Sequence, residues 1–172
     1  MFVIRPATAE DMAAVAELWH VGWHDGHAGH VPEGLTAART LKAFHERTPS
    51  RIVDTTVAVS EDGELLGFIM VAGDEVEQVF VGRDARGTGL AARLLAEAER
   101  QVAGAGHDLA WLAVVEGNAR ARAFYEREGW RDEGDLPYEV SAGGQRFISP
   151  CRRYVKRVAH ERSGGSTLDV PF

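Results

Sequence analysis

Two glycines in an Arg-Gly-Thr-Gly sequence, Gly87 and Gly89, stand where an apolar strand ends and an amphipathic helix begins. Val-Phe-Val at residues 79–81 ends the strand, and leucine and alanine recur at helical spacing over residues 90–98. Glycine adopts φ angles closed to other residues and lets a ligand approach the backbone, so successive amide N–H groups can converge on one anion. The positive end of the following helix strengthens this attraction. The stretch therefore predicts a phosphate-binding loop.

Two known phosphate loops differ from this one. A nucleotide P-loop carries a lysine after its last glycine, and Thr88 stands at that place. The dinucleotide fingerprint fits Gly87, Gly89 and Ala92, but it normally follows the first strand of a parallel domain, whereas this loop follows a hairpin. Its acidic residue is also misplaced, because Asp108 precedes the next strand instead of ending it. The sequence excludes the P-loop and leaves nicotinamide binding as a lower-ranked alternative.

A third pattern, Arg/Gln-x-x-Gly-x-Gly/Ala, is matched by Arg86, Gly89 and Ala91. A second motif follows, an Asn-x-x-Ala-x-x-Phe-Tyr helix with a glycine and an aromatic residue behind it, at Asn118, Ala121, Phe124, Tyr125, Gly129 and Trp130. Together the two motifs resemble those of the GNAT superfamily of N-acetyltransferases, which grip acetyl-CoA by such a pyrophosphate loop. The resemblance covers roughly residues 75–130 and extends to the hairpin that follows.

The resemblance implies an α/β (mixed α+β) fold of the acyl-CoA N-acyltransferase type. Its central sheet is expected to be mixed but mostly antiparallel, with about seven strands that splay apart between the fourth and fifth, and about four flanking helices. Acetyl-CoA, the co-substrate, would lie in that gap, with its pantetheine arm paired to the strand and its pyrophosphate held by the amides from Arg86 to Ala91. Asn118 fits a helix cap equally well. The implied cofactor-binding residues are Val79, Phe80, Val81, Arg86, Gly87, Thr88, Gly89, Leu90, Ala91 and Asn118.

Acetyl transfer to an amine sets two further requirements. The attacking amine must be neutral, so a base accepts its proton directly or through water, and the departing thiolate benefits from an acid. The resemblance makes Tyr125 the catalytic acid, because many members of the family carry that group at this position. Glu77 is the expected catalytic base, since it shares strand parity with Val79 and Val81. The alternatives for the base are water, Glu75, His24 and His27.

Aromatic and histidine side chains gather within residues 19–30. The spacing of His20, His24 and His27 places them on one helix face, but glycines interrupt the span and no coordinating Cys, Asp or Glu completes a metal-binding set. We therefore expect no metal site, and we expect Trp23, His24 and His27 to line the acceptor pocket. Specificity should reside in the region from Trp19 to Arg47 and in the closing hairpin.

Composition limits the remaining alternatives. The chain has 172 residues, 45% of them hydrophobic, which suits one domain over residues 1–158 and a C-terminal tail over residues 159–172. A formal net charge of -7 argues against nucleic-acid binding, which rests on Lys and Arg contacts to phosphates. Cys151 is the only cysteine, no apolar run reaches the length of a membrane span, and the N-terminus does not resemble a signal peptide. We expect a cytoplasmic protein without a membrane or nucleic-acid partner.

The expected elements follow from periodicity and turn residues. A strand over residues 2–5 precedes a helix that begins after Thr8 and ends near Gly22 and Gly26. A second amphipathic helix starts at Leu35 and is ended by Thr48 and Pro49. Three antiparallel strands are expected next, at 55–59, 65–71 and 75–81, followed by the glycine-loop helix. A right-handed crossover then leads to a strand at 109–115 that is buried on both faces. A helix at 119–128 and a hairpin around 138–140 and 147–158 complete the domain.

The resemblance implies an N-acetyltransferase that moves an acetyl group from acetyl-CoA to a primary amine of a small molecule or peptide by direct attack. The alternative is a non-catalytic acyl-CoA-binding regulatory or interaction module that keeps the glycine loop and lacks acceptor chemistry. The family also implies a homodimer formed through the closing hairpin or the tail. Neither motif identifies the acceptor amine.

Overall fold

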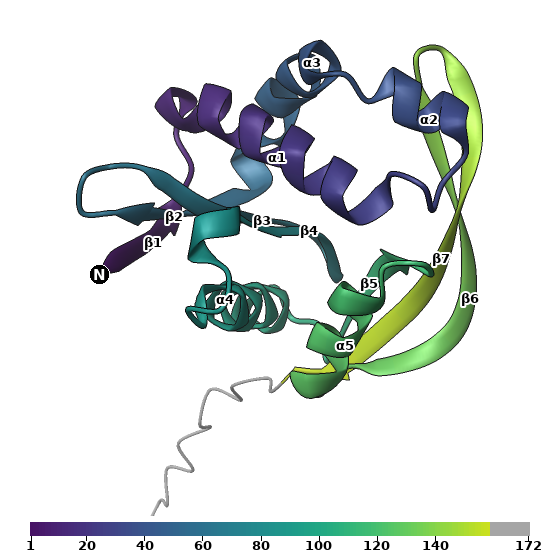
Figure 1. Ribbon diagram of the computed structural model, residues 1–172. Coiled ribbons are helices and arrows are strands. Elements are labelled where there is room, and N and C mark those ends of the chain that lie inside the picture. The colour runs from purple at the N-terminus through teal and green to yellow at the C-terminus, as the bar shows by residue number, and fades with distance from the viewer. Residues whose placement is uncertain (159–172) are drawn as a thin grey trace, which may run out of the picture.

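One seven-stranded sheet organises residues 1–158, the part of the chain that the computed structural model describes (Figure 1). Its strands are β1 Phe2–Pro6, β2 Thr55–Ser60, β3 Leu65–Ala72, β4 Glu75–Val81, β5 Leu109–Val115, β6 Arg131–Ala142 and β7 Gln145–Arg157. They lie in the order β1-β2-β3-β4-β5-β7-β6, and only β4 and β5 are parallel, with the single register pair Glu75 and Trp111. The expected mixed, mostly antiparallel sheet is confirmed. The predicted tail, residues 159–172, lies outside the described residues.

Five α-helices cover the sheet within the described residues: α1 Met12–His27, α2 Glu33–Ala38, α3 Leu41–Arg51, α4 Leu90–Gly104 and α5 Ala119–Arg127. Figure 1 shows α1 and α3 on one side of the sheet and α4 and α5 on the other. The buried side chains form two matching clusters, one around Trp19, Phe44 and Phe68 and one around Ile69 and Leu94. No described helix is long and apolar enough to cross a membrane.

Helix α1 runs to His27, one residue past Gly26, so it ends near the second of the two expected glycines, whereas Gly22 lies inside the helix. Both glycines are buried. A Cβ atom at Gly22 would lie 2.4 Å from the Phe80 ring, and one at Gly26 would lie 2.8 Å from the amide nitrogen of Asn118. The glycines therefore let α1 pack closely on β4 and on the start of α5. This packing outweighs their low helix propensity.

The predicted second helix is two helices, α2 and α3, separated at Arg39 and Thr40. Thr40 caps α3, because its Oγ1 accepts a hydrogen bond of 3.1 Å from the Ala43 N–H. Pro49 does not stop α3 but lies inside its last turn. The break matters for the site, since it brings the Arg39 side chain to the boundary between the two helices.

Strand β5 is fully buried on one face only, which corrects the expectation of two buried faces. On the other face Val115 is the one buried residue. Ala110 and Leu112 lie in the core, whereas Leu109 exposes 39% of its surface and Trp111 and Ala113 are half-buried. Beyond the single register pair with β4, β5 diverges from its neighbour, and Ala113 lines a cavity there. The continuous apolar run therefore reflects a core face and a cavity face.

The closing hairpin is longer than expected. Strands β6 and β7 pair along their whole lengths, and the turn between them is made by Gly143 and Gly144, with φ angles of 57° and 76°. Figure 1 shows the hairpin rising past the sheet to reach α2. A Cβ atom at Gly143 would lie 3.5 Å from the Cβ of Ala38 in that helix. The hairpin thus forms one wall of the space beneath α1 and α2.

Close packing of α1 on β4 is tested by Gly22→Ala. The added methyl group must displace the Phe80 ring, so we expect the free energy of unfolding to fall by about 1–3 kcal/mol despite the better helix propensity of alanine. Urea unfolding measures this change. Gly104→Ala, at the end of α4 with no heavy atom within 4 Å of the new Cβ, is the matched control and should be as stable as the parent or slightly more stable. Equal stabilities of the two variants would contradict the packing argument.

Candidate active site

The gap between β4 and β5 leaves one edge of β4 without a partner strand. On the other edge, the Gly82 N–H donates a 2.8 Å hydrogen bond to the Leu66 carbonyl of the neighbouring strand segment. Residues of an antiparallel pair alternate between hydrogen-bonded and non-hydrogen-bonded positions, so Phe80 is the next residue that bonds to β3. Val79 and Val81 therefore direct their backbone N–H and C=O groups into the gap. An extended ligand can pair with these groups as an added strand.

The glycine loop leads from β4 into α4 with the predicted backbone conformation. Gly87 and Gly89 have φ angles of 76° and 83°, and Gly89 is the N-cap of α4. The N–H groups of residues 87–91 donate no backbone hydrogen bond within the described chain, whereas the Arg86 N–H is bound to the Arg83 carbonyl at 3.3 Å. The Arg86 amide is therefore not free for an anion, and the amides that follow it are.

A cavity of about 410 Å³, here called the loop cavity, lies between the glycine loop, β4, α1 and α5. Thr88 and Leu90 do not line it: the Thr88 hydroxyl donates to the Ala85 carbonyl, and the Leu90 side chain is buried in the core. The other predicted cofactor-binding residues all line it, namely Val79, Phe80, Val81, Arg86, Gly87, Gly89, Ala91 and Asn118.

Asp25, near the end of α1, forms ion pairs with two arginines of the glycine loop. Its carboxylate accepts hydrogen bonds from Arg83 at 2.6 and 3.1 Å and from Arg86 at 2.9 Å. The Arg83 hydrogen bond, followed by that of Arg86, lowers the pKa of Asp25 to about 2. Both arginine side chains of the loop are therefore engaged by α1, and the anion-binding groups that remain on the loop are backbone amides.

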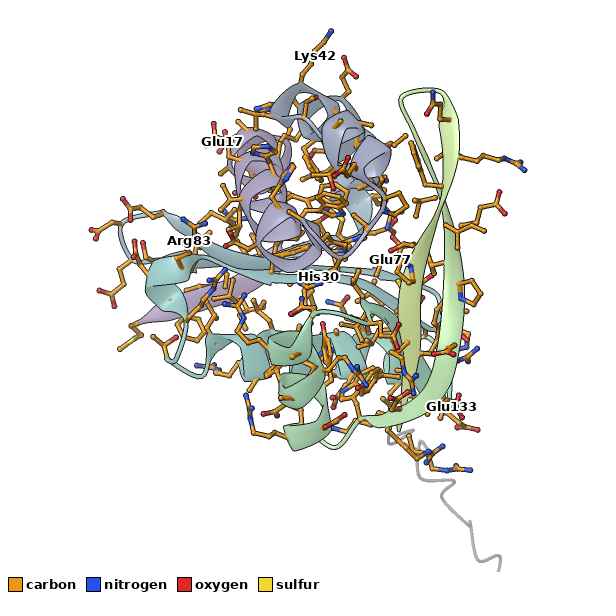
Figure 2. All side chains as sticks on the ribbon, turned by 45° about the vertical axis from the view of Figure 1, so that its right-hand side comes forward. Glu17, His30, Lys42, Glu77, Arg83 and Glu133 are labelled. Atoms are coloured by element: carbon orange, nitrogen blue, oxygen red, sulfur yellow. The ribbon has the colours of Figure 1, made fainter. Side chains whose placement is uncertain are left out.

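A second cavity, of about 440 Å³ and here called the inner cavity, lies on the other side of the gap. It is walled by α1, the α2–α3 segment, β4, β5 and the closing hairpin, so both regions expected to hold specificity contribute to it. Figure 2 shows Glu77 in the space between the helices and that hairpin. Six residues line both cavities and so mark where they meet: His27, Val79, Phe80, Asn118, Ala121 and Tyr125.

Tyr125 lies at this junction, one turn from the end of α5. Its ring is 9% exposed and packs against Phe124, Trp130 and Tyr154, with ring centroids 5.3, 6.2 and 6.1 Å away. Its hydroxyl makes no hydrogen bond with the described residues, so it is free for a ligand. Burial raises the pKa of Tyr125 well above its ordinary value, so the hydroxyl keeps its proton at neutral pH.

Asn118 also lies at the junction and performs the helix-capping role. Its Oδ1 accepts a 3.2 Å hydrogen bond from the Ala121 N–H at the start of α5. Its amide nitrogen packs against the backbone of α1 at Gly26 and donates no hydrogen bond to the described residues. The cap fixes the side chain, and the free NH₂ group is available to a ligand in either cavity.

The Glu77 side chain lines the inner cavity, but a β-bulge and not strand parity places it there. Met70 pairs with Gln78 but Val71 pairs with Val76, so Glu77 is an extra residue in β4, a β-bulge. The expected shared parity with Val79 is therefore wrong: Val79 packs on the α4 side of the sheet, whereas Glu77 forms an ion pair with Arg51 at the end of α3. One carboxylate oxygen of Glu77 is held by this pair, and the other accepts no hydrogen bond from the described residues.

Glu75 is the second carboxylate of the inner cavity. Its Oε1 accepts a 3.0 Å hydrogen bond from the Tyr138 hydroxyl of β6. Burial, with smaller contributions from the nearby charges of Glu77 and Asp74, raises the pKa of Glu75. A carboxyl group with a raised pKa is a better proton acceptor near neutral pH, so Glu75 is chemically as suited to be a base as Glu77.

The three predicted acceptor residues are placed differently. Trp23 lines the inner cavity and His27 lines both, with their rings stacked 4.5 Å apart, whereas His24 lines neither. His27 Nδ1 donates to the Trp23 carbonyl at 2.8 Å, which leaves Nε2 as the acceptor nitrogen of the neutral ring, and burial lowers the pKa of His27 to about 4. His24 Nε2 donates to the Arg39 carbonyl at 2.7 Å. His24 thus holds the α2–α3 break rather than a cavity wall.

Several charged or polar residues of the site were not identified from the sequence. They are Asp25 on α1, Arg39, Arg47 and Arg51 in the α2–α3 segment, and Tyr138 on β6. Arginines on an amphipathic helix are typical of a solvent-exposed face, so no local signal marked them. Only the general expectation that this region and the hairpin decide specificity pointed to them.

Comparisons with known proteins agree with this architecture. The model of the Acetyltransferase (GNAT) family matches residues 13–130. An uncharacterised N-acetyltransferase of Mycobacterium tuberculosis (strain ATCC 25618 / H37Rv) is 28% identical over 120 residues, which cover 67% of this chain and 74% of the relative. The apo form of YjaB from Escherichia coli has a TM-score of 0.70 and 21% identity, covering 90% of this chain and 97% of that one. YncA from Salmonella typhimurium, solved with acetyl-CoA, has a TM-score of 0.67 and 16% identity, covering 96% and 99%.

The family match spans more than half of the chain. The protein therefore belongs to the GNAT family of acetyltransferases, as the two sequence motifs implied. The likeness to the solved structures extends this to the fold of nearly the whole chain, including the β6–β7 hairpin.

The contact between α1 and the glycine loop is tested by Asp25→Asn. A folded-state pKa of about 2 against an ordinary 3.8 means that the carboxylate stabilises the folded protein above pH 3.8 and that this contribution is lost as the pH falls towards 2. Arg83 is largely exposed, so we expect a loss of about 1 kcal/mol at pH 7 that shrinks towards pH 2, measured by urea unfolding across this range. The control is Asp84→Asn, an exposed carboxylate of the same loop without an ion pair in residues 1–158. A loss that is the same at every pH would contradict the ion pair.

Proposed function

We propose that the protein transfers an acetyl group from acetyl-CoA to a primary amine of a small molecule or peptide by direct attack, with Tyr125 as acid. The observation that carries the proposal is the junction of the two cavities at a buried tyrosine whose hydroxyl has no hydrogen-bond partner among the described residues. One cavity offers strand-like backbone groups and free amides, and the other offers carboxylates. A thioester from one side and an amine from the other can meet only at this junction.

Acetyl-CoA fits the loop cavity by chemistry. Its pantetheine arm has amide groups that match the free backbone groups of Val79 and Val81, and its pyrophosphate matches the N–H groups of residues 87–91 at the N-terminus of α4. Membership of the family and the acetyl-CoA bound to the Salmonella protein support the same co-substrate. The volume of about 410 Å³ also suits a ligand of which part extends over the surface.

The roles of the side chains follow from the reaction. The amine nitrogen forms a bond to the thioester carbonyl carbon, the carbon–sulfur bond breaks, and the nitrogen releases a proton while the sulfur leaves as a thiol. Tyr125 holds the proton that the sulfur takes, and its raised pKa keeps that proton in place until then. A carboxylate of the inner cavity takes the proton of the amine directly or through water. No enzyme nucleophile is needed.

Glu77 and Glu75 are both candidates for the general base. Glu77 has one oxygen held by Arg51, which orients the carboxylate, and Glu75 has the raised pKa and the hydrogen bond from Tyr138. We propose that the carboxylate pair acts together with a bridging water, with Glu77 as the acceptor of the proton. His27 Nε2 is the remaining acceptor at the junction, and its pKa of about 4 makes it a weak base.

We also propose a cytoplasmic location and a homodimer. The first is supported by Cys151, which is buried in β7 as a free thiol, the state that a reducing compartment maintains. The second is supported by β6, which lies at the edge of the sheet and leaves one row of backbone groups open to a strand of a second copy.

The role of Tyr125 is tested by Tyr125→Phe. We expect kcat to fall about 100-fold or more, because the acid for the departing sulfur is lost, while the affinity for acetyl-CoA stays nearly unchanged. Release of the thiol from acetyl-CoA in the presence of a panel of primary amines measures the rate, and calorimetric titration measures the affinity. Tyr154→Phe is the control, since it removes a buried hydroxyl that lines neither cavity. An unchanged rate would contradict the assignment, and binding without any turnover by the parent protein would favour a non-catalytic acyl-CoA-binding module.

The pyrophosphate-binding loop is tested by Gly89→Asp. The carboxylate and the strained φ of 83° should abolish calorimetrically measured binding of acetyl-CoA. Gly106→Asp makes the same change at a φ of 94° just beyond the other end of α4, where a Cβ also meets no atom within 4 Å. This control should lose stability by a similar amount and keep its affinity. Equal loss of binding in both variants would mean that the effect is one of folding, and the loop assignment would fail.

A further inference from the structure

The inner cavity holds more positive groups than its own carboxylates can neutralise. It is lined by the arginines Arg39, Arg47 and Arg51 and by the carboxylates of Glu75 and Glu77. Arg51 is paired with Glu77 and, at 2.9 Å, with Asp54 of the segment that follows α3. Glu75 is hydrogen-bonded to a tyrosine instead of an arginine. Arg39 and Arg47 are left, and neither forms an ion pair within residues 1–158.

Arg39 is the more unusual of the two, because it is 6% exposed and its guanidinium makes no hydrogen bond with the described residues. Its Nε is sealed from solvent without any partner. Burial without a partner is among the least favourable states for a charged group, and it lowers the pKa of Arg39. The backbone at this residue is held by the hydrogen bond from His24 to the Arg39 carbonyl, and the side chain lines the inner cavity. No hydrogen bond or ion pair with residues 1–158 explains the position of this guanidinium.

Arg47 lies over aromatic rings of the same wall. Its guanidinium carbon is 4.5 Å from the centroid of the Trp19 ring and 5.6 Å from that of Phe44. These faces attract a cation but do not neutralise it. Burial, followed by the charges of Arg39 and Arg51, lowers the pKa of Arg47 to about 10, so it remains protonated at neutral pH. Two charged guanidinium groups thus border one cavity without an ion pair to any residue in the range 1–158.

We propose that the acceptor is a small primary amine that also carries an anionic group, a carboxylate or a phosphonate, and that Arg39 and Arg47 bind this group. Guanidinium groups bind such anions with paired N–H donors and are the preferred residues for this task. The inference rests on the proposed function, since it assigns the charged ends of the amine that the inner cavity receives.

The positions of the charges support this orientation. Arg39 and Arg47 come from the α2–α3 break and from α3, whereas Glu75 and Glu77 come from β4 beside the junction with the loop cavity. A ligand with its anion on the arginines therefore directs its amine towards the carboxylates and Tyr125. An amine that lacked an anionic group would leave both arginines buried without a partner, and the inner cavity would select against it.

The test compares acceptors that differ only in the anionic group. For each of several side chains, the free amino acid, its amide and its aminophosphonate analogue are assayed with acetyl-CoA. We expect kcat/KM for one or both anionic compounds to exceed that of the amide by roughly 10- to 100-fold, the range of charge-assisted hydrogen bonds. The better of the two anionic compounds identifies the group. Amides that are acetylated as well as the acids would overturn the inference while leaving the proposed function intact.

Variants assign the preference to the two arginines. In Arg39→Gln and in Arg47→Gln the ratio of kcat/KM between acid and amide should fall towards one, mainly through KM for the acid. Arg100→Gln removes the same charge from an exposed site on α4 that lines neither cavity, and it should keep the ratio. Arg39→Gln should also unfold at the same temperature as the parent or a higher one, because it removes an unpaired buried charge. A structural role for Arg39 predicts the opposite, a lower unfolding temperature with an unchanged ratio, and that result would overturn the inference.

A binding experiment keeps the inference separate from the catalytic proposal. If the protein acetylates no amine, calorimetric titration of the coenzyme A-loaded protein with N-acetyl amino acids and with their amides still tests the arginines. Binding of the acids alone, lost in Arg39→Gln, supports the anion site even though the catalytic proposal has failed. Equal binding of acids and amides, or binding of neither, overturns it.

Discussion

The structure depends on one short strand contact, in which β4 pairs with β5 through a single register pair. Every other neighbouring pair of strands runs antiparallel over several residues, and only here does the sheet open. The opening leaves backbone donors and acceptors of β4 without strand partners, which in a closed sheet would be unfavourable. It also leaves room for the loop cavity and the inner cavity, which meet at Tyr125. The proposed cofactor site and the proposed acceptor site therefore both depend on the gap between β4 and β5.

The elements around the gap are positioned by close backbone approach and by charge. Gly22 and Gly26 let α1 lie directly on β4 and Asn118, and Asp25 in the same helix engages Arg83 and Arg86. Because these arginines are paired with Asp25, we propose that the amides of the glycine loop, whose geometry is fixed by the backbone, recognise the pyrophosphate. The inner cavity shows the reverse arrangement, since its arginines Arg39 and Arg47 form no ion pair with residues 1–158, although Arg47 lies over the Trp19 ring. The first set of charges serves the fold, and the second is available to a ligand.

The elements that sequence reasoning predicted well are those whose signals are local. The glycine loop, the Asn118-to-Tyr125 helix and the three hairpin-connected strands each lie within a short stretch, and the structure contains all of them. The errors came from tertiary effects. The bulge at Glu77 inserts one residue without changing the alternation of residue types, so parity placed its side chain on the wrong face. The glycines of α1 resemble helix ends until β4 is packed against them.

The charge pairs of the site were beyond sequence reasoning for a related reason. Arg51 and Glu77 are 26 residues apart, and Asp25 and Arg83 are 58 apart, so neither pair leaves a spacing that a sequence pattern detects. An unpaired Arg39 is recognisable only when every neighbour is known. The family match identifies the acyl-group chemistry but not the acceptor.

The central claim is that the β4–β5 gap holds acetyl-CoA with its thioester at Tyr125, and a crystal structure of the protein with acetyl-CoA tests it most directly. The account predicts hydrogen bonds from the pantetheine arm to the backbone of Val79 and Val81, pyrophosphate oxygens on the N–H groups of residues 87–91, and the sulfur within hydrogen-bonding distance of the Tyr125 hydroxyl. A nucleotide bound elsewhere, or a thioester remote from Tyr125 with the gap unchanged, would contradict it.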